Sequence, residues 1–462
     1  MFSYHHLDKW AFANLDLVEE ILETESKAVV VIAGASSSGK SYAASYLSGL
    51  LSKNGHRAYT ISLDQYNYGL SHIIPEKVNK NYFDSSIGDI EEIKDEIKEI
   101  IYDIPFEEKY GEKSLSLVEN RFKDRMGPDI LSLFLRGLSE EWAKLNLDET
   151  SVYNLKEASE DVKTLLEGGT IQTKLYSKIV SERVPTDVTV SGKVLDVVIV
   201  EGIYALDNEF LDCFKGCNAL VKNFISGSPK SLYLRRILRD LRISSASSAF
   251  TTKLYFTSIQ KSYMETIYPS RLNADVMLFN DMSFSEMRAG DLYTTKDEIH
   301  TNDNDTIAWL LADSEIYSQE YQRDTYFVTP LEKPDSVQSN ILRLREISND
   351  GGKTYVPSSL VHKGQAKVRK DGKIIRPINV ILKEGEFGQV WKDVSDCYND
   401  FLSSGFQIGQ VKKKIKTRIV YEGQNLAVRQ VDGEGAYIEI GSPRNEEVLN
   451  EIKKRIKDSL VD

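Results

Sequence analysis

The sequence contains few of the residues from which disulfide scaffolds and metal centres are built. It has three cysteines and six histidines among 462 residues. Cys213, Cys217 and Cys397 are odd in number and follow no tight metal-binding spacing, which predicts a reduced, intracellular chain. No stretch is apolar for the length of a membrane span, and the opening MFSYHHLDKW lacks the pattern of a signal peptide. We therefore expect a cytoplasmic protein with no membrane partner.

Excess positive charge is missing as well. The chain carries 58 Lys and Arg against 70 Asp and Glu, which gives a formal net charge of -12 at pH 7. This balance argues against nucleic acid or an anionic membrane as a partner, so any anion must be bound by a local cluster of cations. Hydrophobic residues make up 41% of the sequence, enough for well-packed cores. The length predicts more than one domain, and the composition is compatible with a homo-oligomer.

A complete phosphate-loop motif occupies the segment Ala28 to Ser41, AVVVIAGASSSGKS. A run of small and β-branched residues, typical of a buried strand, ends at Gly34, and GxxxxGKS leads into a helical pattern. The glycines let the loop curl so that backbone N–H groups converge on phosphate oxygens, while Lys40 reaches the phosphates and Ser41 ligates Mg²⁺. The alternative is a Gly–Ser turn without a ligand. The candidate phosphate-binding residues are Gly34, Ala35, Ser36, Ser37, Ser38, Gly39, Lys40 and Ser41.

Two later strands are predicted to end in carboxylates. RAYTISLD predicts a strand that finishes at Asp64, and KVLDVVIVEG predicts a buried strand that ends at Glu201. Ligands bind at the carboxyl ends of strands in open α/β sheets, so both side chains should face the phosphate loop. Asp64 can accept a proton from an attacking hydroxyl or help to hold Mg²⁺, and Glu201 can orient Mg²⁺. Asp64 could instead be a helix cap or a turn former.

A helix with clustered arginines follows the second of these strands. In SLYLRRILRDLR, the spacing of Arg235, Arg236 and Arg239 brings several guanidinium groups to one side of a helix. Near a phosphate site, such a cluster clamps the transferred group and its leaving phosphate. The alternative is a solvated basic face that is paired with acids.

Residues 28–285 resemble the uridine kinase and phosphoribulokinase group of phosphate-loop kinases. The matching segments are GASSSGKS, SLDQY, KLYSK, VIVEGIYAL, YLRRILRD and YPSRLNADVML. The resemblance implies ATP as the donor, Asp64 as the base on a nucleoside 5′-hydroxyl, and Glu201 near Mg²⁺. It also implies lid arginines and a tyrosine beside the acceptor, namely Arg235, Arg236, Arg239 and Tyr176. The family has an aspartate where this chain has Ser177, so the resemblance supports ATP binding more than uridine as the acceptor.

The second half of the sequence has a different pattern. From about residue 290, alternating segments are separated by dipeptides that predict hairpin turns between antiparallel strands: Asp350-Gly351, Asp371-Gly372, Glu422-Gly423 and Asp432-Gly433. In VKKKIKTRIVY and ILRLRE, cations recur at every second residue, so each strand carries its cations on one face. A solvated sheet and a barrel lined to hold a polyanion both fit this pattern.

The segments YQRDTYFVTP, NILRLRE, SLVHKGQ and RQVDGEGAYIEIG together resemble a CYTH domain, the triphosphate tunnel fold. The resemblance implies Glu439 as a metal ligand and a ring of cations around a triphosphate, formed by Arg343, Arg345, Lys363, Lys416 and Arg418. The family's opening ExExK strand is not present. Because the loss of metal-holding carboxylates affects hydrolysis more than anion binding, we expect a tunnel that binds a phosphorylated ligand rather than an efficient triphosphatase.

These patterns predict an α/β fold followed by an antiparallel barrel. Residues 1–288 are interpreted as a uridine-kinase-like phosphate-loop domain with a parallel sheet, and residues 289–462 as a CYTH-like tunnel barrel. Residues 71–150 contain two helical patterns, IEEIKDEIKEII and ILSLFLRGLSEEWAKL, and are interpreted as a helical insertion or lid.

The preferred hypothesis is a kinase that uses ATP and Mg²⁺ to phosphorylate a hydroxyl of a nucleoside or similar small molecule. Its expected catalytic residues are Asp64, Lys40, Arg236 and Arg239. One alternative is hydrolysis of tripolyphosphate, pyrophosphate or nucleoside triphosphates by the CYTH half. Another is non-catalytic nucleotide sensing.

Overall fold

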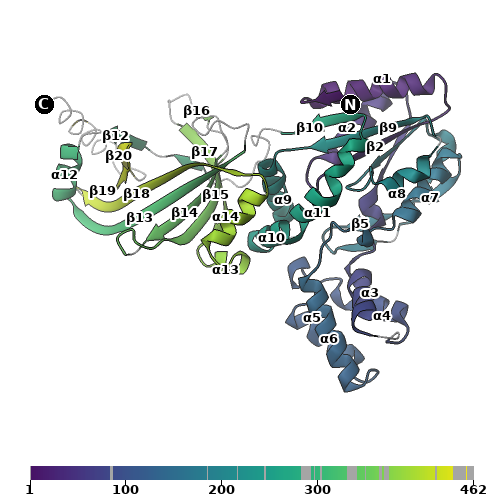
Figure 1. The fold of residues 1–462 in the computed structure, drawn as a ribbon, viewed down its shortest axis with the longest axis horizontal. Coiled ribbons are helices and arrows are strands. Elements are labelled where there is room, and N and C mark those ends of the chain that lie inside the picture. Colours follow the sequence, from purple (N-terminus) through teal and green to yellow (C-terminus); the bar gives the residue numbers. More distant parts are fainter. Residues whose placement is uncertain are drawn as a thin grey trace. The chain divides into compact units, whose positions relative to one another are not determined.

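The chain forms two compact units in the computed structural model, Met1–Met282 and Ser283–Asp462, which are described separately below (Figure 1). The structure describes residues 2–83, 87–184, 186–215, 217–243, 246–281, 293–295, 297–301, 304–329, 341–348, 350–363, 367–368, 374–421, 424–440 and 454. Among these residues, no helix combines the length and the apolar composition needed to cross a membrane.

Unit 1 is built on a six-stranded sheet in which neighbouring strands run parallel, in the order β1-β10-β9-β2-β8-β3. This confirms the predicted parallel α/β sheet. The strands are β1 (Phe2–Tyr4), β2 (Ala28–Gly34), β3 (Ala58–Ser62), β8 (Val197–Glu201), β9 (Leu220–Ser226) and β10 (Val276–Phe279). Helices α1 (Leu7–Leu22), α2 (Lys40–Lys53), α7 (Leu155–Leu166), α8 (Asn208–Leu211), α9 (Pro229–Ile243), α10 (Ser248–Leu254) and α11 (Gln260–Ser262) accompany the sheet.

Helices on both faces of the sheet explain the apolar run of β2. Val29 and Val31 belong to a core that includes α7 residues. Val30 and Ile32 belong to a second core that includes residues of α1 and α2. Successive side chains of a strand point to opposite faces, so a strand that is covered on both sides must be apolar at every position.

The predicted insertion contains more helix than its sequence pattern indicates. It consists of α3 (Leu70–Tyr82), α4 (Ile90–Ile101), α5 (Glu112–Phe122) and α6 (Pro128–Ala143), which lie together in Figure 1. The two helical patterns correspond to α4 and α6. Two short antiparallel strand pairs follow the insertion: β5 (Leu175–Ser177) and β6 (Glu182–Val184) form a hairpin, and β4 (Thr170–Gln172) and β7 (Thr189–Ser191), which flank it in the chain, pair with each other.

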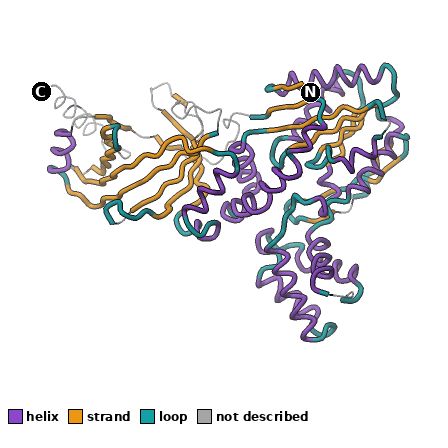
Figure 2. Tube along the Cα trace, in the orientation of Figure 1, coloured by secondary structure: helices purple, strands orange, loops and turns teal. Residues whose placement is uncertain are grey.

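Unit 2 is built on an antiparallel sheet, whose strands are orange in Figure 2. The strand order is β11-β17-β15-β14-β13-β18-β19-β20-β12, and β16 pairs with β17. The strands at the two ends of this order are separated by one residue in the chain. The sheet therefore returns on itself, because alternate Cα atoms are at most about 7 Å apart. Its strands are β11 (Tyr293–Thr295), β12 (Asp297–Thr301), β13 (Glu315–Val328), β14 (Ile341–Ser348), β15 (Val356–Lys363), β16 (Lys367–Val368), β17 (Ile374–Lys383), β18 (Gln407–Tyr421), β19 (Gln424–Val431) and β20 (Gly435–Ile440).

The hairpins of unit 2 follow the predicted dipeptides. Gly351 and Gly433 both have φ 74°, and they lie between the paired strands β14 and β15 and the paired strands β19 and β20. The turn dipeptides at 371–372 and 422–423 lie outside the described residues, although the strands on either side of each are paired. Helices α12 (Asn304–Ala312), α13 (Phe387–Val390) and α14 (Val394–Ser403) accompany the sheet. Phe327 of β13 stacks on Phe401 of α14, with ring centroids 4.4 Å apart.

Candidate functional site

The phosphate-loop sequence forms the strand, loop and helix that its motif predicts. β2 ends at Gly34 and α2 begins at Lys40. Gly34 has φ 148°, and a Cβ atom there would lie 2.1 Å from the carbonyl oxygen of Ile225 on β9, so only glycine fits. Gly39 has φ 96° and directly precedes α2. The positive end of the helix therefore adjoins the loop, as anion binding requires.

Lys40 and Ser41, the last two residues of the motif, contact different groups: Lys40 contacts the loop itself, and Ser41 contacts the carboxylate of Glu201. Lys40 is buried, and its Nζ donates to the carbonyl oxygen of Ala35 at 2.8 Å. Ser41 donates from Oγ to Glu201 Oε1 at 3.0 Å, and Ser62 donates to the same oxygen at 2.5 Å. Burial raises the pKa of Glu201, and the nearby Asp64 carboxylate adds to this shift. A hydroxyl and a carboxylate at the first turn of α2 provide the oxygen ligands that Mg²⁺ prefers.

Asp64 follows β3, but not as a strand residue. The predicted strand extends two residues too far at its C-terminal end, because β3 ends at Ser62 and the four residues Leu63–Tyr66 form a 3₁₀ turn. Asp64 Oδ2 lies 2.7 Å from Lys178 Nζ. Burial opposes ionisation of this carboxyl, but the ion pair with Lys178 and the charge of Lys40 outweigh it and hold the pKa of Asp64 below its usual value. At neutral pH Asp64 is therefore a carboxylate.

The arginine-rich helix α9 directs two guanidinium groups at the loop. Arg236 and Arg239 donate to opposite oxygens of Asp240, at 2.6 and 2.9 Å. Their terminal nitrogens lie 3.0 and 3.4 Å from Ser36 Oγ. Arg235 donates to the carbonyl oxygen of Asn280 at 2.9 Å. Since Arg236 is only 5% exposed, this side of α9 is not a solvated basic face.

These groups surround one cavity of about 330 Å³, a size suited to a small-molecule ligand. Eleven of the predicted site residues line it: Ser36, Ser37, Gly39, Lys40, Ser41, Asp64, Tyr176, Glu201, Arg235, Arg236 and Arg239. Gly34, Ala35 and Ser38 belong to the loop but are not among the lining residues. The cavity is further lined by residues that the sequence patterns did not reveal, including Asp148, Tyr153, Lys178, Ser181 and Asp240.

Asp148 is the most unusual of the additional residues. It is 5% exposed, and within the described part of the chain its buried Oδ2 atom has no hydrogen-bond partner. Burial raises the pKa of Asp148, although Arg236 and Arg239 counter the shift. Its backbone is fixed by Asn146, whose side chain accepts from the Asp148 N–H at 3.1 Å. Asp148 stands in a polar loop with no periodic pattern, so only an Asx-turn signal marks it.

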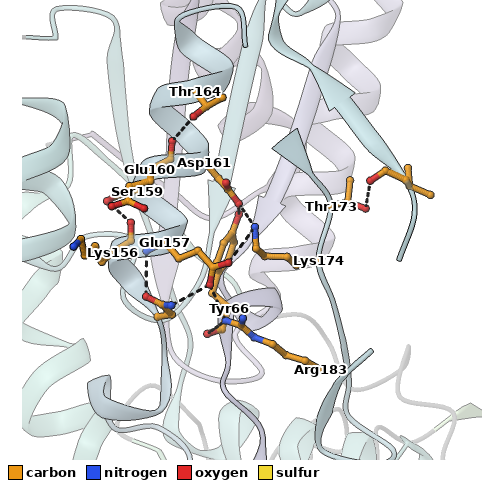
Figure 3. Close-up of polar contacts among 12 residues, drawn as sticks. Tyr66, Lys156, Glu157, Ser159, Glu160, Asp161, Thr164, Thr173, Lys174 and Arg183 are labelled. Atoms are coloured by element: carbon orange, nitrogen blue, oxygen red, sulfur yellow. Dashed lines mark hydrogen bonds and ion pairs between the residues drawn. The ribbon is translucent and has the colours of Figure 1, made fainter. Parts of the chain in front are cut away.

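A group of charged residues on and around α7 supports the Asp64 turn. We call Tyr66, Glu157, Asp161, Lys174 and Arg183 the α7 clamp (Figure 3). Tyr66 donates to Asp161 Oδ2 at 2.7 Å. Lys174 pairs with Glu157 and Asp161, and Arg183 pairs with Glu157 at 3.2 Å. Tyr66 and Lys174 belong to the segments SLDQY and KLYSK. Glu157, Asp161 and Arg183 lie in none of the quoted segments, and the contacts of the group join parts of the chain that are distant in sequence.

In unit 2, three of the alternating cations converge on one buried carboxylate. Asp324 is fully buried and lies 2.7 Å from Arg345, 2.5 Å from Lys414 and 3.5 Å from Arg343. Burial opposes its ionisation, but these cations hold the pKa of Asp324 well below its usual value. Burial also lowers the pKa of Lys414 to about 8. The strands thus carry these cations on one shared face.

The remaining predicted tunnel residues lie on β15, β18 and β20 of the same sheet. Lys416 and Arg429 pair with the two oxygens of Glu439 at 3.0 and 3.2 Å, and Arg418 pairs with Glu320 at 2.6 Å. The predicted metal ligand Glu439 is therefore engaged by two cations. The β14–β15 register places Lys363 opposite Ile341, on the face that also carries Arg343 and Arg345.

Among the described residues, no group of three or more His, Cys, Asp or Glu side chains could hold a metal ion. This finding is compatible with the Ser41 and Glu201 site, because Mg²⁺ usually takes one or two carboxylates together with phosphates and waters.

Comparison with known proteins identifies sequence relatives for unit 1. No family model matches the chain. It is 28% identical to the uridine kinase of Macrococcus caseolyticus over 157 residues, which cover 34% of this chain and 72% of that protein. It is 29% identical to the uridine kinase of Streptococcus uberis over 157 residues, which cover 34% of this chain and 71% of that protein. The N-terminal third is thus similar to uridine kinases and carries a kinase-like nucleotide-binding motif.

Solved structures were also compared. A protein described as a possible uridine kinase, from Bacillus stearothermophilus, has a TM-score of 0.29 and 13% identity, and covers 58% of this chain and 99% of its own. HpAC1 of Hippeastrum, described as having a dominant triphosphatase activity, has a TM-score of 0.27 and 15% identity, and covers 35% of this chain and 86% of its own. At these scores the likeness adds nothing to the topology described above.

Proposed function

We propose that unit 1 is a phosphotransferase that uses ATP and Mg²⁺ to phosphorylate a hydroxyl of a nucleoside or similar small molecule. The observation that carries this proposal is the convergence of a phosphate loop, the carboxylates of Asp64 and Glu201 and the α9 arginines on one cavity. The similarity to uridine kinases over 157 residues supports the same class of reaction.

In this proposal each element has a separate task. The backbone N–H groups of the loop and of the first turn of α2 bind the donor phosphates. Lys40, Arg236 and Arg239 supply positive charge where negative charge spreads over the transferred group. Asp64 accepts the proton of the attacking hydroxyl. The hydroxyl oxygen bonds to the γ-phosphorus as the bond between that phosphorus and ADP breaks.

Magnesium fits the same cavity. Ser41 and Glu201 would hold the ion, and their shared hydrogen bond of 3.0 Å already brings the two oxygen donors together. When bound, the ion neutralises charge on the donor phosphates.

The test is a product-resolved assay with ATP, Mg²⁺ and a panel of nucleosides. Asp64→Asn keeps the size of the side chain and removes the proton acceptor, so we expect a loss of turnover of about 100-fold or more. Asp129→Asn, at an exposed position on α6, is the matched control and should retain full turnover. Absence of ADP formation with every acceptor would refute the proposal.

A second function is favoured by the cations of unit 2. In the ion pairs described above, six cations share three carboxylates: Arg343, Arg345, Lys414, Lys416, Arg418 and Arg429 against Asp324, Glu320 and Glu439. The surplus of three positive charges favours a polyphosphate or nucleotide on this face. Engagement of Glu439 by two cations favours binding over metal-assisted hydrolysis.

Binding calorimetry, combined with the phosphotransfer assay above, separates this second function from the first. A Lys416→Ala, Arg418→Ala double variant should lose tripolyphosphate binding, measured by calorimetry, while it retains phosphotransfer. Asp64→Asn should show the opposite pattern. Hydrolysis of tripolyphosphate at the same rate in the parent and in the double variant would remove unit 2 as its source.

A further inference from the structure

The Asp64 turn begins where the ladder of the sheet ends. β3 pairs with β8 as far as Ser62, which lies opposite Glu201. Asp64 stands two residues later, in the turn Leu63–Tyr66. The β3–β8 ladder no longer fixes the backbone at that point, so the position of this carboxylate depends on groups that reach the turn from elsewhere.

One arginine binds the backbone two and three residues after Asp64. Arg183 donates from Nε to the carbonyl oxygen of Asn67 at 2.9 Å and from a terminal nitrogen to that of Tyr66 at 3.0 Å. The same terminal nitrogen lies 3.2 Å from Glu157, and the guanidinium carbon lies 5.6 Å from the ring centroid of Tyr68. A planar guanidinium with several donors in fixed directions can hold these groups in one arrangement, which an ammonium group cannot.

Arg183 also belongs to the hairpin that contributes Tyr176 and Lys178 to the cavity. In the β5–β6 pairing it lies opposite Tyr176, which lines the cavity. Lys178, in the connection between these two strands, pairs with Asp64 at 2.7 Å. One side chain therefore joins the segment that carries the candidate base to the segment that carries the candidate acceptor residues.

The carboxylate behind Arg183 is itself held in place. Glu157 lies 3.3 Å from Lys174 and accepts from the side chain of Asn154 at 3.0 Å. Lys174 directly precedes β5, so both strands of the hairpin are tied to α7, as Figure 3 shows for Lys174 and Arg183 around Glu157. The contacts thus form a continuous connection to the cavity from α7, whose inner side is packed into the core by Ala158, Val162 and Leu165.

We propose that Arg183, fixed by Glu157, is a positioning residue that sets the Asp64 carboxylate relative to Tyr176 and Lys178. This role rests on the proposed phosphotransfer. Arg183 touches neither reactant in it; it acts through the backbone of Tyr66 and Asn67 and through its own strand.

The test compares two arginines of the same unit. Arg183→Lys keeps the charge and removes the planar fork. Arg57→Lys is the matched control, because Arg57 also makes a two-pronged pair, with Asp196 at 3.2 and 3.0 Å, but precedes β3 at the end opposite to Asp64. Glu157→Gln removes the anchor while leaving Arg183 intact. The full chain is used throughout.

We expect Arg183→Lys to lower kcat by about 10- to 100-fold, the scale of a misplacement of about 1 Å in an active site, with the KM for ATP unchanged. Glu157→Gln should give a smaller loss of the same kind. The acid limb of the pH–rate profile should move to higher pH in Arg183→Lys, because a looser Asp64–Lys178 pair no longer holds the pKa of Asp64 down. Arg57→Lys should change none of these values.

Hydrogen exchange provides a readout that does not depend on activity. Amides of residues 63–68 and 175–182 should exchange at least about tenfold faster in Arg183→Lys than in the parent and in Arg57→Lys. A folded Arg183→Lys protein with parental exchange in both segments, or with parental kcat and acid limb, would overturn the inference. If the parent transfers phosphate to no acceptor, the proposed function fails, and exchange alone then decides whether Arg183 fixes the turn.

Discussion

At the scale of single residues, the candidate base is controlled by its neighbours. Asp64 forms an ion pair with Lys178 at 2.7 Å and interacts electrostatically with the buried Lys40. These two cations lower the pKa of Asp64, although burial acts in the opposite direction. Glu201, on the adjacent strand, has its pKa raised by burial and by Asp64. Two carboxyl groups of one cavity are therefore shifted in opposite directions, which is typical of functional sites.

Replacing Lys178 should change the pH at which Asp64 becomes ionised. Lys178→Met keeps an unbranched side chain, one atom shorter, and removes the charge, so the pKa of Asp64 should rise. The acid limb of the phosphotransfer rate, which requires ionised Asp64, should then move to higher pH, as measured by rates between pH 4 and pH 8. Lys156→Met, at an exposed position on α7, is the control. An acid limb at the same pH in both variants would show that Lys178 does not control the base.

At the scale of elements, the local patterns predicted strands and turns better than the insertion. The continuous apolar run of β2 and the alternating cations of β18 are local signals, and glycines with positive φ mark two hairpins. The sequence patterns did not predict helices α3 and α5, because the helical periodicity of their apolar residues is weak. The sequence patterns also did not predict Asp148, Lys178 and Arg183 as site residues, because their roles arise from contacts between segments that are distant in sequence.

Close packing of two helices within the insertion gives a stability prediction. A Cβ atom on Gly137 of α6 would lie 2.8 Å from Val78 Cγ1 of α3, whereas one on Gly49 of α2 would meet nothing within 4 Å. Gly137→Ala should therefore destabilise unit 1 by about 1–3 kcal/mol. Gly49→Ala should stabilise it by up to about 1 kcal/mol. Denaturant unfolding measures both, and equal effects would contradict this packing.

At the scale of the whole molecule, two units with separate cores are expected to unfold in separate steps. Asp324 is the buried counter-charge for Arg343, Arg345 and Lys414. Because its folded-state pKa is depressed, Asp324 contributes stability above its unfolded-state pKa, and this contribution is lost as the pH falls.

Asp324→Asn should lower the stability of unit 2 by about 3–5 kcal/mol at neutral pH, since it leaves buried cations without their carboxylate. In calorimetry, only the transition of unit 2 should move, and the difference from the parent should shrink in acid. Glu384→Gln, an exposed substitution in the same unit, should leave both transitions in place. A shift of the unit 1 transition in Asp324→Asn would show that the two units do not unfold separately.

The return of the second sheet on itself has a consequence for biosynthesis. Its closing pairs join residues 297–301 to residues 436–440, so a ribosome must synthesise the chain as far as residue 440 before the ring can form. Until then, β12 and β19 lack their shared partner β20, and their edges are exposed to other nascent chains. We expect truncated products that end before residue 436 to be the aggregating species in cells that make this protein.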